Sequence, residues 1–288
     1  MNHPADYLKR LLKLYPVSTI KESFGVEGSF NEFVDKIIPK KDLIKSFAED
    51  CHGLTKQNIY IFSIKKKYNK DDNLNGLDLR VQTQKVSETG EYIFFALPIC
   101  KFSVYLNINN NIKLDEINFY QPLLIKISEK HLIIQFTKLE KNLSHYFPAE
   151  NAARKVDENN SEEEILYNIL SYFSLRGYNP LPLDMNAGIK HLWEIDTLDC
   201  HRISWLEEFS TAERKMHGDL TFKLKYPKLY EEMKHTPLGK SVWKYLIKDN
   251  YFCELFTTNV NTGVISVTSF PKTSNQISNV VNKILEHN

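Results

Sequence analysis

The sequence predicts an α+β protein with three parts: an N-terminal four-helix module, a central antiparallel β-sheet and a C-terminal α+β portion. Residues 4–53 hold short amphipathic segments with helix-capping patterns, whereas residues 58–138 hold β-branched and aromatic runs between short turns. Helical periodicity returns after residue 161. These patterns predict domains over residues 1–56, 57–147 and 161–288, with residues 148–160 as a linker.

The N-terminal module is predicted to be a compact bundle of four short helices. Pro4 to Leu14 carries its leucines on one face, and Pro16 ends that helix. Thr19 to Glu22 and Ser29 to Glu32 both have the capping-box pattern, in which a hydroxyl and a carboxylate satisfy exposed amides at a helix start. The fourth helix is expected to end at His52-Gly53.

Residues 57–147 are predicted to form an antiparallel meander, because a short turn follows each apolar run. Ile59 to Ile64 is apolar on both faces, which is typical of an interior strand, and Leu77 to Thr83 alternates as a half-exposed strand does. The clearest hairpin joins Leu123–Ile127 to Leu132–Thr137 through four turn-forming residues. The aromatic residues of these runs are interpreted as core.

The segment from Pro148 to Asn160 is polar and lacks large apolar residues, so we expect an exposed linker with few contacts. A strong helix is predicted from Ser161 to just before Gly177. The remaining elements are predicted as helices around residues 187–193, 228–233 and 238–247, an extended segment over 200–206, a hairpin over 252–258 and 264–270, and a last helix from residue 274.

Composition indicates a soluble cytoplasmic protein. The apolar fraction is 42%, the charged fraction is 25%, and the longest apolar run is far too short to span a membrane. The four cysteines form no CxxC pair, so reduced thiols are expected at Cys51, Cys100, Cys200 and Cys253. We expect no signal peptide, no membrane contact and no cofactor.

Positive charge is concentrated near the N-terminus, although the net charge is only +1. Residues 1–70 hold 13 Lys and Arg against 8 Asp and Glu, whereas the rest of the chain holds 24 against 28. This excess indicates contact with DNA or RNA, although a face for a partner protein or a solvated basic face explains it as well. The residues predicted to meet phosphate are Lys9, Arg10, Lys13, Lys40, Lys41, Lys65, Lys66 and Lys67.

A cluster of acids and histidines offers an alternative, catalytic site. His191 and Glu194 would share a face of a helix, and Asp199 and His201 would share a face of a strand, with His217 and Asp219 further on. Together they could hold a divalent metal that activates water. The cluster has no HExxH spacing, and the chain also lacks a phosphate-binding loop and a GxSxG motif.

The sequence therefore favours a non-enzymatic binding or scaffold subunit of an intracellular multiprotein complex, touching nucleic acid through its basic N-terminal region. The alternative is a metal-dependent hydrolase or nuclease that uses the His191–Asp219 cluster. Heavy use of Lys, Asn and Ile is typical of an AT-rich microbial genome. A role in bacterial antiviral defence is a conjecture drawn from that usage alone.

Overall fold

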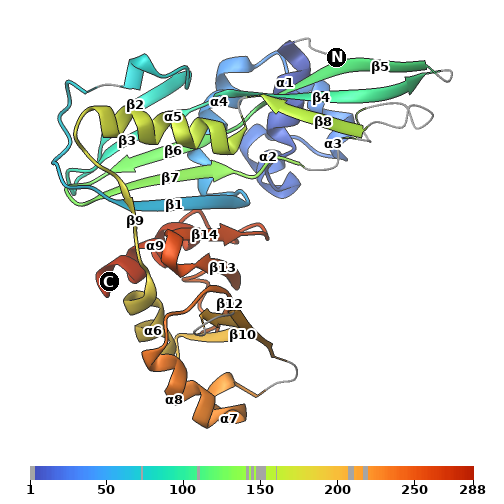
Figure 1. The fold of residues 1–288 in the computed structure, drawn as a ribbon. Coiled ribbons are helices and arrows are strands. Elements are labelled where there is room, and N and C mark those ends of the chain that lie inside the picture. Colours follow the sequence, from blue (N-terminus) through green and yellow to red (C-terminus); the bar gives the residue numbers. More distant parts are fainter. Residues whose placement is uncertain are drawn as a thin grey trace.

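A computed structural model describes residues 4–72, 74–108, 111–140, 143, 146, 154–159, 161–206, 211–216 and 220–288. It confirms the mixed α+β class. Figure 1 shows an upper body of helices and sheet, and a lower body that hangs from it where β14 meets β1.

The N-terminal module contains the four predicted helices. Their bounds are α1 Pro4–Leu12, α2 Val17–Phe24, α3 Phe30–Ile37 and α4 Lys41–Asp50, followed by the 3₁₀ turn η1 His52–Leu54. The capping box at Ser29 and Glu32 is formed at the start of α3. The capping box predicted at Thr19 is wrong, because α2 already begins at Val17, directly after Pro16.

The large sheet is antiparallel throughout, but its strands do not follow chain order. Among the described residues the order is β11, β10, β12, β13, β14, β1, β7, β6, β3, β2, with β9 beside the end of β1. A strict meander would pair β1 with β2, whereas β1 pairs with β7 on one side and β14 on the other. The reason is that β1 is apolar on both faces and belongs in the interior, whereas β2 is largely exposed and lies at the edge. The bounds are β1 Gln57–Ser63, β2 Val81–Val86, β3 Tyr92–Ala96, β6 Leu123–Ile127, β7 His131–Thr137, β9 Leu181–Pro182, β10 Leu198–Leu206, β11 Thr211–Lys215, β12 Lys240–Tyr245, β13 Leu255–Asn259 and β14 Val264–Val267.

A second sheet of three strands projects from the upper body (Figure 1). It consists of β4 Ile99–Ile108, β5 Asn111–Tyr120 and β8 Arg154–Asn159, in the order β5, β4, β8. The strand β8 corrects the prediction of an irregular linker, because residues 154–159 pair with β4 between Lys101 and Tyr105. Backbone pairing requires no apolar side chain, so a polar segment can complete the sheet. The rest of the predicted linker lies outside the described residues.

The C-terminal portion mixes helices and strands as predicted. Its helices are α5 Glu162–Leu175, α6 Asn186–Glu194, α7 Phe222–Lys225, α8 Pro227–His235 and α9 Gln276–Glu286. The helix predicted over residues 238–247 is wrong, because β12 occupies that stretch. Leu238, Val242 and Tyr245 fit helical spacing, but Ser241, Trp243 and Tyr245 fit the period of a strand, and their burial stabilises the sheet.

The strand β1 forms a wall shared by two of the three apolar cores. Ile59 and Ile61 pack into the core of the lower body around Trp193, whereas Phe62 packs beneath α5. A third core lies between the N-terminal helices and Phe95. Because a continuous sheet runs through β1 and β14, the predicted division into domains stays a prediction.

The four cysteines are free thiols, as predicted. Among the described residues, no helix combines the length and the apolar character needed to cross a bilayer.

Candidate nucleic-acid interface

The structure places the two helical members of the predicted acid–histidine cluster at the end of α6. The His191 ring stacks on the His287 ring of the C-terminal segment, with 3.8 Å between the centroids. Glu194 is exposed, and its backbone carbonyl accepts a hydrogen bond from the Lys223 ammonium at 2.7 Å. His191 therefore contacts another histidine rather than the acids.

The two strand members of the cluster lie at a β-bulge in β10. The Asp199 carboxylate accepts the Phe222 backbone N–H at 3.0 and 3.3 Å, and burial raises the pKa of this carboxyl. The β10 register shifts between Cys200 and Arg202, so His201 is an extra residue that breaks the alternation and points its side chain into solvent. No group of three or more His, Cys, Asp or Glu within the described part of the chain could hold a metal ion. His217 and Asp219 lie outside it.

The three basic residues in and directly after the first helix have different surroundings. Lys9 forms a 2.6 Å ion pair with Asp35. The Arg10 side chain is buried, donates to the Asn118 carbonyl oxygen at 2.6 Å, and has a pKa lowered by desolvation. Lys13 is exposed, with its ammonium 4.6 Å from the centroid of the Tyr146 ring. Of the three, Lys13 is the one best placed to meet a ligand.

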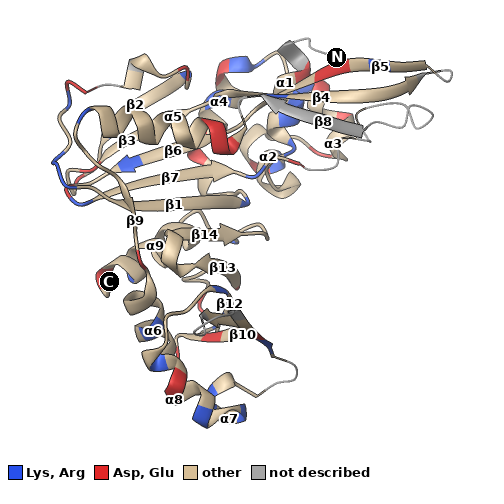
Figure 2. Ribbon diagram, in the orientation of Figure 1, with Lys and Arg blue, Asp and Glu red and all other residues tan. Residues whose placement is uncertain are grey.

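The other predicted phosphate contacts lie elsewhere. Lys40 and Lys41 are exposed at the start of α4. Lys65, Lys66 and Lys67 follow the end of β1, whereas α4 precedes its beginning. Figure 2 shows Lys and Arg both among the N-terminal helices and in the loops at the opposite end of the upper body. That the predicted set forms one continuous face stays a prediction.

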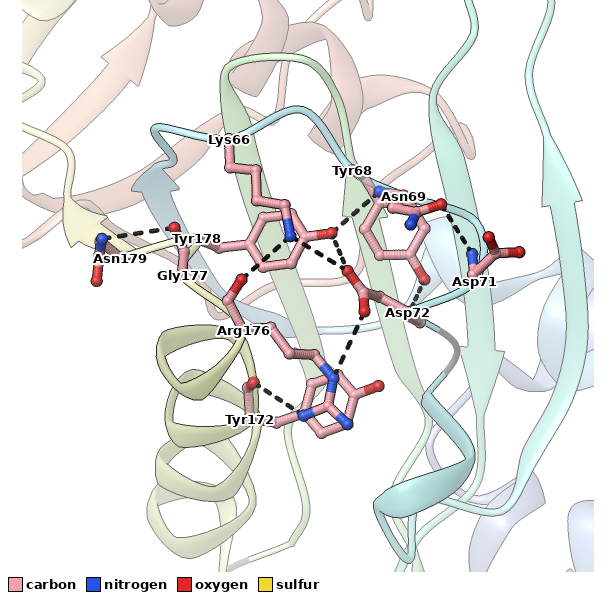
Figure 3. Close-up of polar contacts among 10 residues, drawn as sticks. All are labelled: Lys66, Tyr68, Asn69, Asp71, Asp72, Tyr172, Arg176, Gly177, Tyr178 and Asn179. Atoms are coloured by element: carbon pink, nitrogen blue, oxygen red, sulfur yellow. Dashed lines mark hydrogen bonds and ion pairs between the residues drawn. The ribbon is translucent and has the colours of Figure 1, made fainter.

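Two of the three lysines after β1 already have partners. Lys67 forms a 2.6 Å ion pair with Glu129 in the β6–β7 turn. Lys66 lies 3.6 Å from the Asp72 carboxylate and donates to the Arg176 carbonyl oxygen at 3.2 Å. Figure 3 shows the Lys66 side chain pointing toward Asp72, beside Arg176 and Tyr178.

The Asp72 network explains the position of Lys66 structurally. The Asp72 carboxylate accepts the Tyr178 hydroxyl at 2.6 Å and lies 3.8 Å from the Arg176 guanidinium, which stacks on the Tyr172 ring at 3.6 Å (Figure 3). Burial raises the pKa of Tyr178 to about 12. The network ties the loop after β1 to the C-terminal end of α5, and its cations are neutralised locally.

Another row of cations, which includes Lys9, Arg10 and Lys13 of the predicted set, lines three hollows with shared lining residues at the junction of the N-terminal module and the two bodies. The first hollow, of about 330 Å³, lies beside α1 and α3 and shares Lys13 with the second, of about 700 Å³. The second shares Phe270 with the third, of about 550 Å³, which lies beside β12 and the loop after β14. We call this row the basic track; its cations are Lys9, Arg10, Lys13, Lys56, Lys138, Lys244, Lys248 and Lys272. Four acids face them among the described lining residues: Asp6, Asp35, Glu140 and Glu254.

The centre of the basic track holds an aromatic ring between cations. Phe270 is 40% exposed, and the Lys56 ammonium lies 4.7 Å from the centroid of its ring. The pairing of β1 with β7 sets Lys56 beside Lys138, because the Lys138 N–H donates to the Lys56 carbonyl oxygen at 2.8 Å. The Lys138 ammonium in turn donates to the Ser266 hydroxyl at 2.5 Å. Backbone pairing therefore fixes the middle of the track.

A smaller pocket of about 350 Å³ opens beside the middle hollow and shares Lys138 with it. Its polar wall is Glu162, the first residue of α5. The Glu162 carboxyl accepts the Tyr60 hydroxyl at 2.6 Å and the Asn58 amide at 2.8 Å. Burial raises the pKa of Glu162, although these hydrogen bonds oppose the shift. The pocket thus places a hydrogen-bonding carboxyl beside a cationic groove. We call it the Glu162 pocket.

Sequence reasoning missed most of the basic track. Lys56 and Lys138 flank the paired residues Gln57 and Thr137, so only the β1–β7 register brings them together. Aromatic residues of apolar strand runs are expected in the core, but Phe270 lies beyond the end of β14 and is partly exposed. A local signal exists for Lys9, Arg10 and Lys13, through the basic first helix.

Comparison with known proteins adds no assignment: no family model matches the chain, and no curated protein matches it significantly.

Proposed function

We propose that this chain binds single-stranded nucleic acid along the basic track, as a non-enzymatic binding or scaffold subunit of a multiprotein complex. The observation that carries the proposal is Phe270, a partly exposed ring beside Lys56 in the middle of a row of cationic hollows. Proteins that hold single strands combine a positively charged groove along the backbone with aromatic rings on which bases stack.

A single strand fits this arrangement better than a duplex does. The faces of bases in a duplex are covered by their neighbours, so a lone protein ring can stack only on an unpaired base. We therefore expect binding that does not depend on base sequence and that prefers single strands to duplexes.

The salt dependence of binding follows from the number of phosphates neutralised. Contact through Lys13, Lys56, Lys138 and Lys272 would give a log–log slope of about −3, since each phosphate contact with a single strand contributes about −0.7. Affinity would then fall roughly 50-fold between about 50 and 200 mM salt. A polar contact without phosphate neutralisation would show almost no slope.

The test compares two variants with the same change in charge. Lys13→Glu/Lys56→Glu alters the basic track, whereas Lys40→Glu/Lys41→Glu alters the exposed start of α4. Both change the net charge equally, so long-range attraction weakens equally and any difference reports contact. Fluorescence anisotropy with labelled single-stranded DNA, single-stranded RNA and duplex DNA should show the larger loss for Lys13→Glu/Lys56→Glu. Equal losses would extend the site to Lys40 and Lys41, as the sequence predicted.

The ring is tested separately by Phe270→Ala. Stacking of one base contributes about 1–3 kcal/mol, so single-strand affinity should fall roughly 5- to 150-fold without a change in salt slope. Duplex binding should hardly change. If the wild type binds neither DNA nor RNA at low salt, the nucleic-acid proposal is wrong and only the scaffold prediction remains. Protein partners and a role in antiviral defence stay predictions, as does the hydrolase alternative, which the described residues do not favour.

A further inference from the structure

The β4–β5 hairpin leaves one side of β5 without a neighbouring strand among the described residues. Figure 1 shows this hairpin projecting from the upper body, with β5 along its outer edge. Ile112 and Leu114 of β5 are 76% and 59% exposed, and Tyr105, which faces Leu114 across the hairpin, is 44% exposed. An exposed apolar edge strand of this kind is a template for pairing with another chain.

The register shows which backbone groups of β5 point outward. Ile108 and Asn111 are paired across a two-residue connection, so they form a hydrogen-bonded pair and the odd-numbered residues of β5 face β4. The Gln121 N–H, which donates to the Pro98 carbonyl oxygen at 3.0 Å, continues the same alternation. The N–H and C=O groups of Ile112, Leu114, Glu116 and Asn118 therefore point to the open side.

Half of this open side is already protected. The Asn118 carbonyl oxygen accepts the Arg10 guanidinium at 2.6 Å, and the Glu116 N–H donates to the Asp115 side chain at 2.8 Å. The structure shows no such partner for Ile112 and Leu114 within its described residues. The unprotected part of the edge is thus short and centred on Leu114.

We infer that this edge pairs with β5 of a second copy of the chain, antiparallel, with Leu114 on the two-fold axis. This register places Lys113 of each copy opposite Asp115 of the other, in non-hydrogen-bonded positions where side chains approach most closely. An axis through Lys113 would oppose two lysines, and an axis through Asp115 would oppose two aspartates. Charge complementarity selects the register on Leu114, and the two leucines then contact each other.

Pairing also exchanges one hydrogen bond for another. In the single copy the Asp115 carboxylate accepts the Glu116 N–H. In the pair, the Glu116 N–H donates to the Ile112 carbonyl oxygen of the second copy, and Asp115 becomes the partner of the second copy's Lys113. The Glu116 N–H is therefore satisfied in both states, whereas the backbone groups of Ile112 and Leu114 gain protein partners only in the pair. This inference is independent of the nucleic-acid proposal.

A charge-swap series tests it by sedimentation equilibrium. Lys113→Glu and Asp115→Lys should each weaken self-association about 30-fold, because two attractive cross-strand pairs become repulsive. An equimolar mixture of the two variants should associate again, since each position then faces the opposite charge. The double variant Lys113→Glu/Asp115→Lys should also recover. Lys130→Glu, an equal charge change in the exposed β6–β7 turn, should leave association intact.

Hydrogen exchange gives a second readout on the wild type. The amides of Ile112 and Leu114 should become protected as protein concentration rises. A monomer at all concentrations, or a dimer indifferent to Lys113→Glu, would overturn the inference. Protection of these amides only after addition of a different protein would assign the edge to that partner and would also overturn self-pairing.

Discussion

Replacing Glu162 by glutamine is expected to leave the protein as stable as the wild type at neutral pH, or slightly more stable. The glutamine carbonyl can still accept the Tyr60 hydroxyl and the Asn58 amide, which now meet Glu162 at 2.6 and 2.8 Å. It removes a charge whose burial outweighs these hydrogen bonds, as the raised pKa of Glu162 indicates. Loss of a carboxylate at the start of α5 limits the gain, because helix N-termini favour negative charge by about 0.3–1 kcal/mol.

Glu162→Ala is the contrasting variant. It leaves the Tyr60 hydroxyl and the Asn58 amide without their acceptor in a partly buried site. Each unsatisfied donor costs about 1–3 kcal/mol when buried, so we expect a loss of about 2–4 kcal/mol in the free energy of unfolding after allowing for partial exposure. The pair of variants separates the need for an acceptor from the need for a charge.

The raised pKa of Glu162 determines whether its contribution to stability rises or falls with pH. The folded protein holds the Glu162 proton more tightly than the unfolded chain, because its pKa is raised from the ordinary value of 4.5. Stability from this group is therefore present at low pH and is lost as pH rises through the folded pKa. Urea unfolding across this range should show the loss in the wild type and not in Glu162→Gln. If Glu162→Gln falls by more than about 1 kcal/mol at neutral pH, the carboxylate is required in its ionised form and the reasoning fails.

Three further expectations can be measured by the same urea unfolding. Gly188→Ala should lower the free energy of unfolding by about 1–3 kcal/mol, because a Cβ there would lie 2.2 Å from the Ile284 carbonyl oxygen. A gain of about 1 kcal/mol, the usual effect of replacing glycine by alanine in a helix, would show that α6 and α9 separate easily. Arg10→Gln should cost about 1.5–3 kcal/mol, because it loses the charged hydrogen bond to the Asn118 carbonyl oxygen, and an unchanged midpoint would exclude a structural role for this bond. Burial lowers the pKa of His52 to about 3, so the free energy of unfolding of the wild type should fall by about 2–3 kcal/mol between about pH 6.5 and 4.5, as the unfolded chain binds the proton. His52→Gln should lack this acid-dependent loss of stability.

Local elements of the fold were predictable because neighbouring residues determine them. The β6–β7 hairpin needs only two apolar strands with four turn residues between them. The β13–β14 hairpin turns at Gly263, whose φ of +65° suits glycine, and this glycine lies between the two predicted strands of the hairpin. The capping box at Ser29 likewise depends on residues three positions apart.

Elements that depend on distant partners were not predictable in this way. The strand β8 exists because β4 offers an open edge, and its own side chains give no sign of a strand. The bulge at His201 breaks an alternation that is regular in the sequence. The basic track joins residues more than 200 positions apart, so composition reveals its charge only as a weak N-terminal excess.

The position of the basic track leads to a last prediction about the joint between the two bodies. Within the described part of the chain, β1 of the upper body pairs with β14 of the lower body at four register positions, from Gln57–Val267 to Tyr60–Val264. The basic track has Lys56 at one side of this joint and Lys272 at the other, so a bound single-stranded nucleic acid would bridge the joint.

A nucleic acid that bridges the joint should suppress the local separation of β14 from β1. At a free ligand concentration of about 100 times Kd, the stabilisation is about 2.7 kcal/mol, and it should disappear at high salt together with binding. Hydrogen exchange of Val264–Val267 with and without an oligonucleotide measures this directly. Protection confined to the lysine-bearing segments, with β14 exchanging as before, would show that the ligand occupies one body alone. Protection of β14 would make the joint itself part of the binding site, because the bound oligonucleotide would then stabilise the short pairing of β1 with β14.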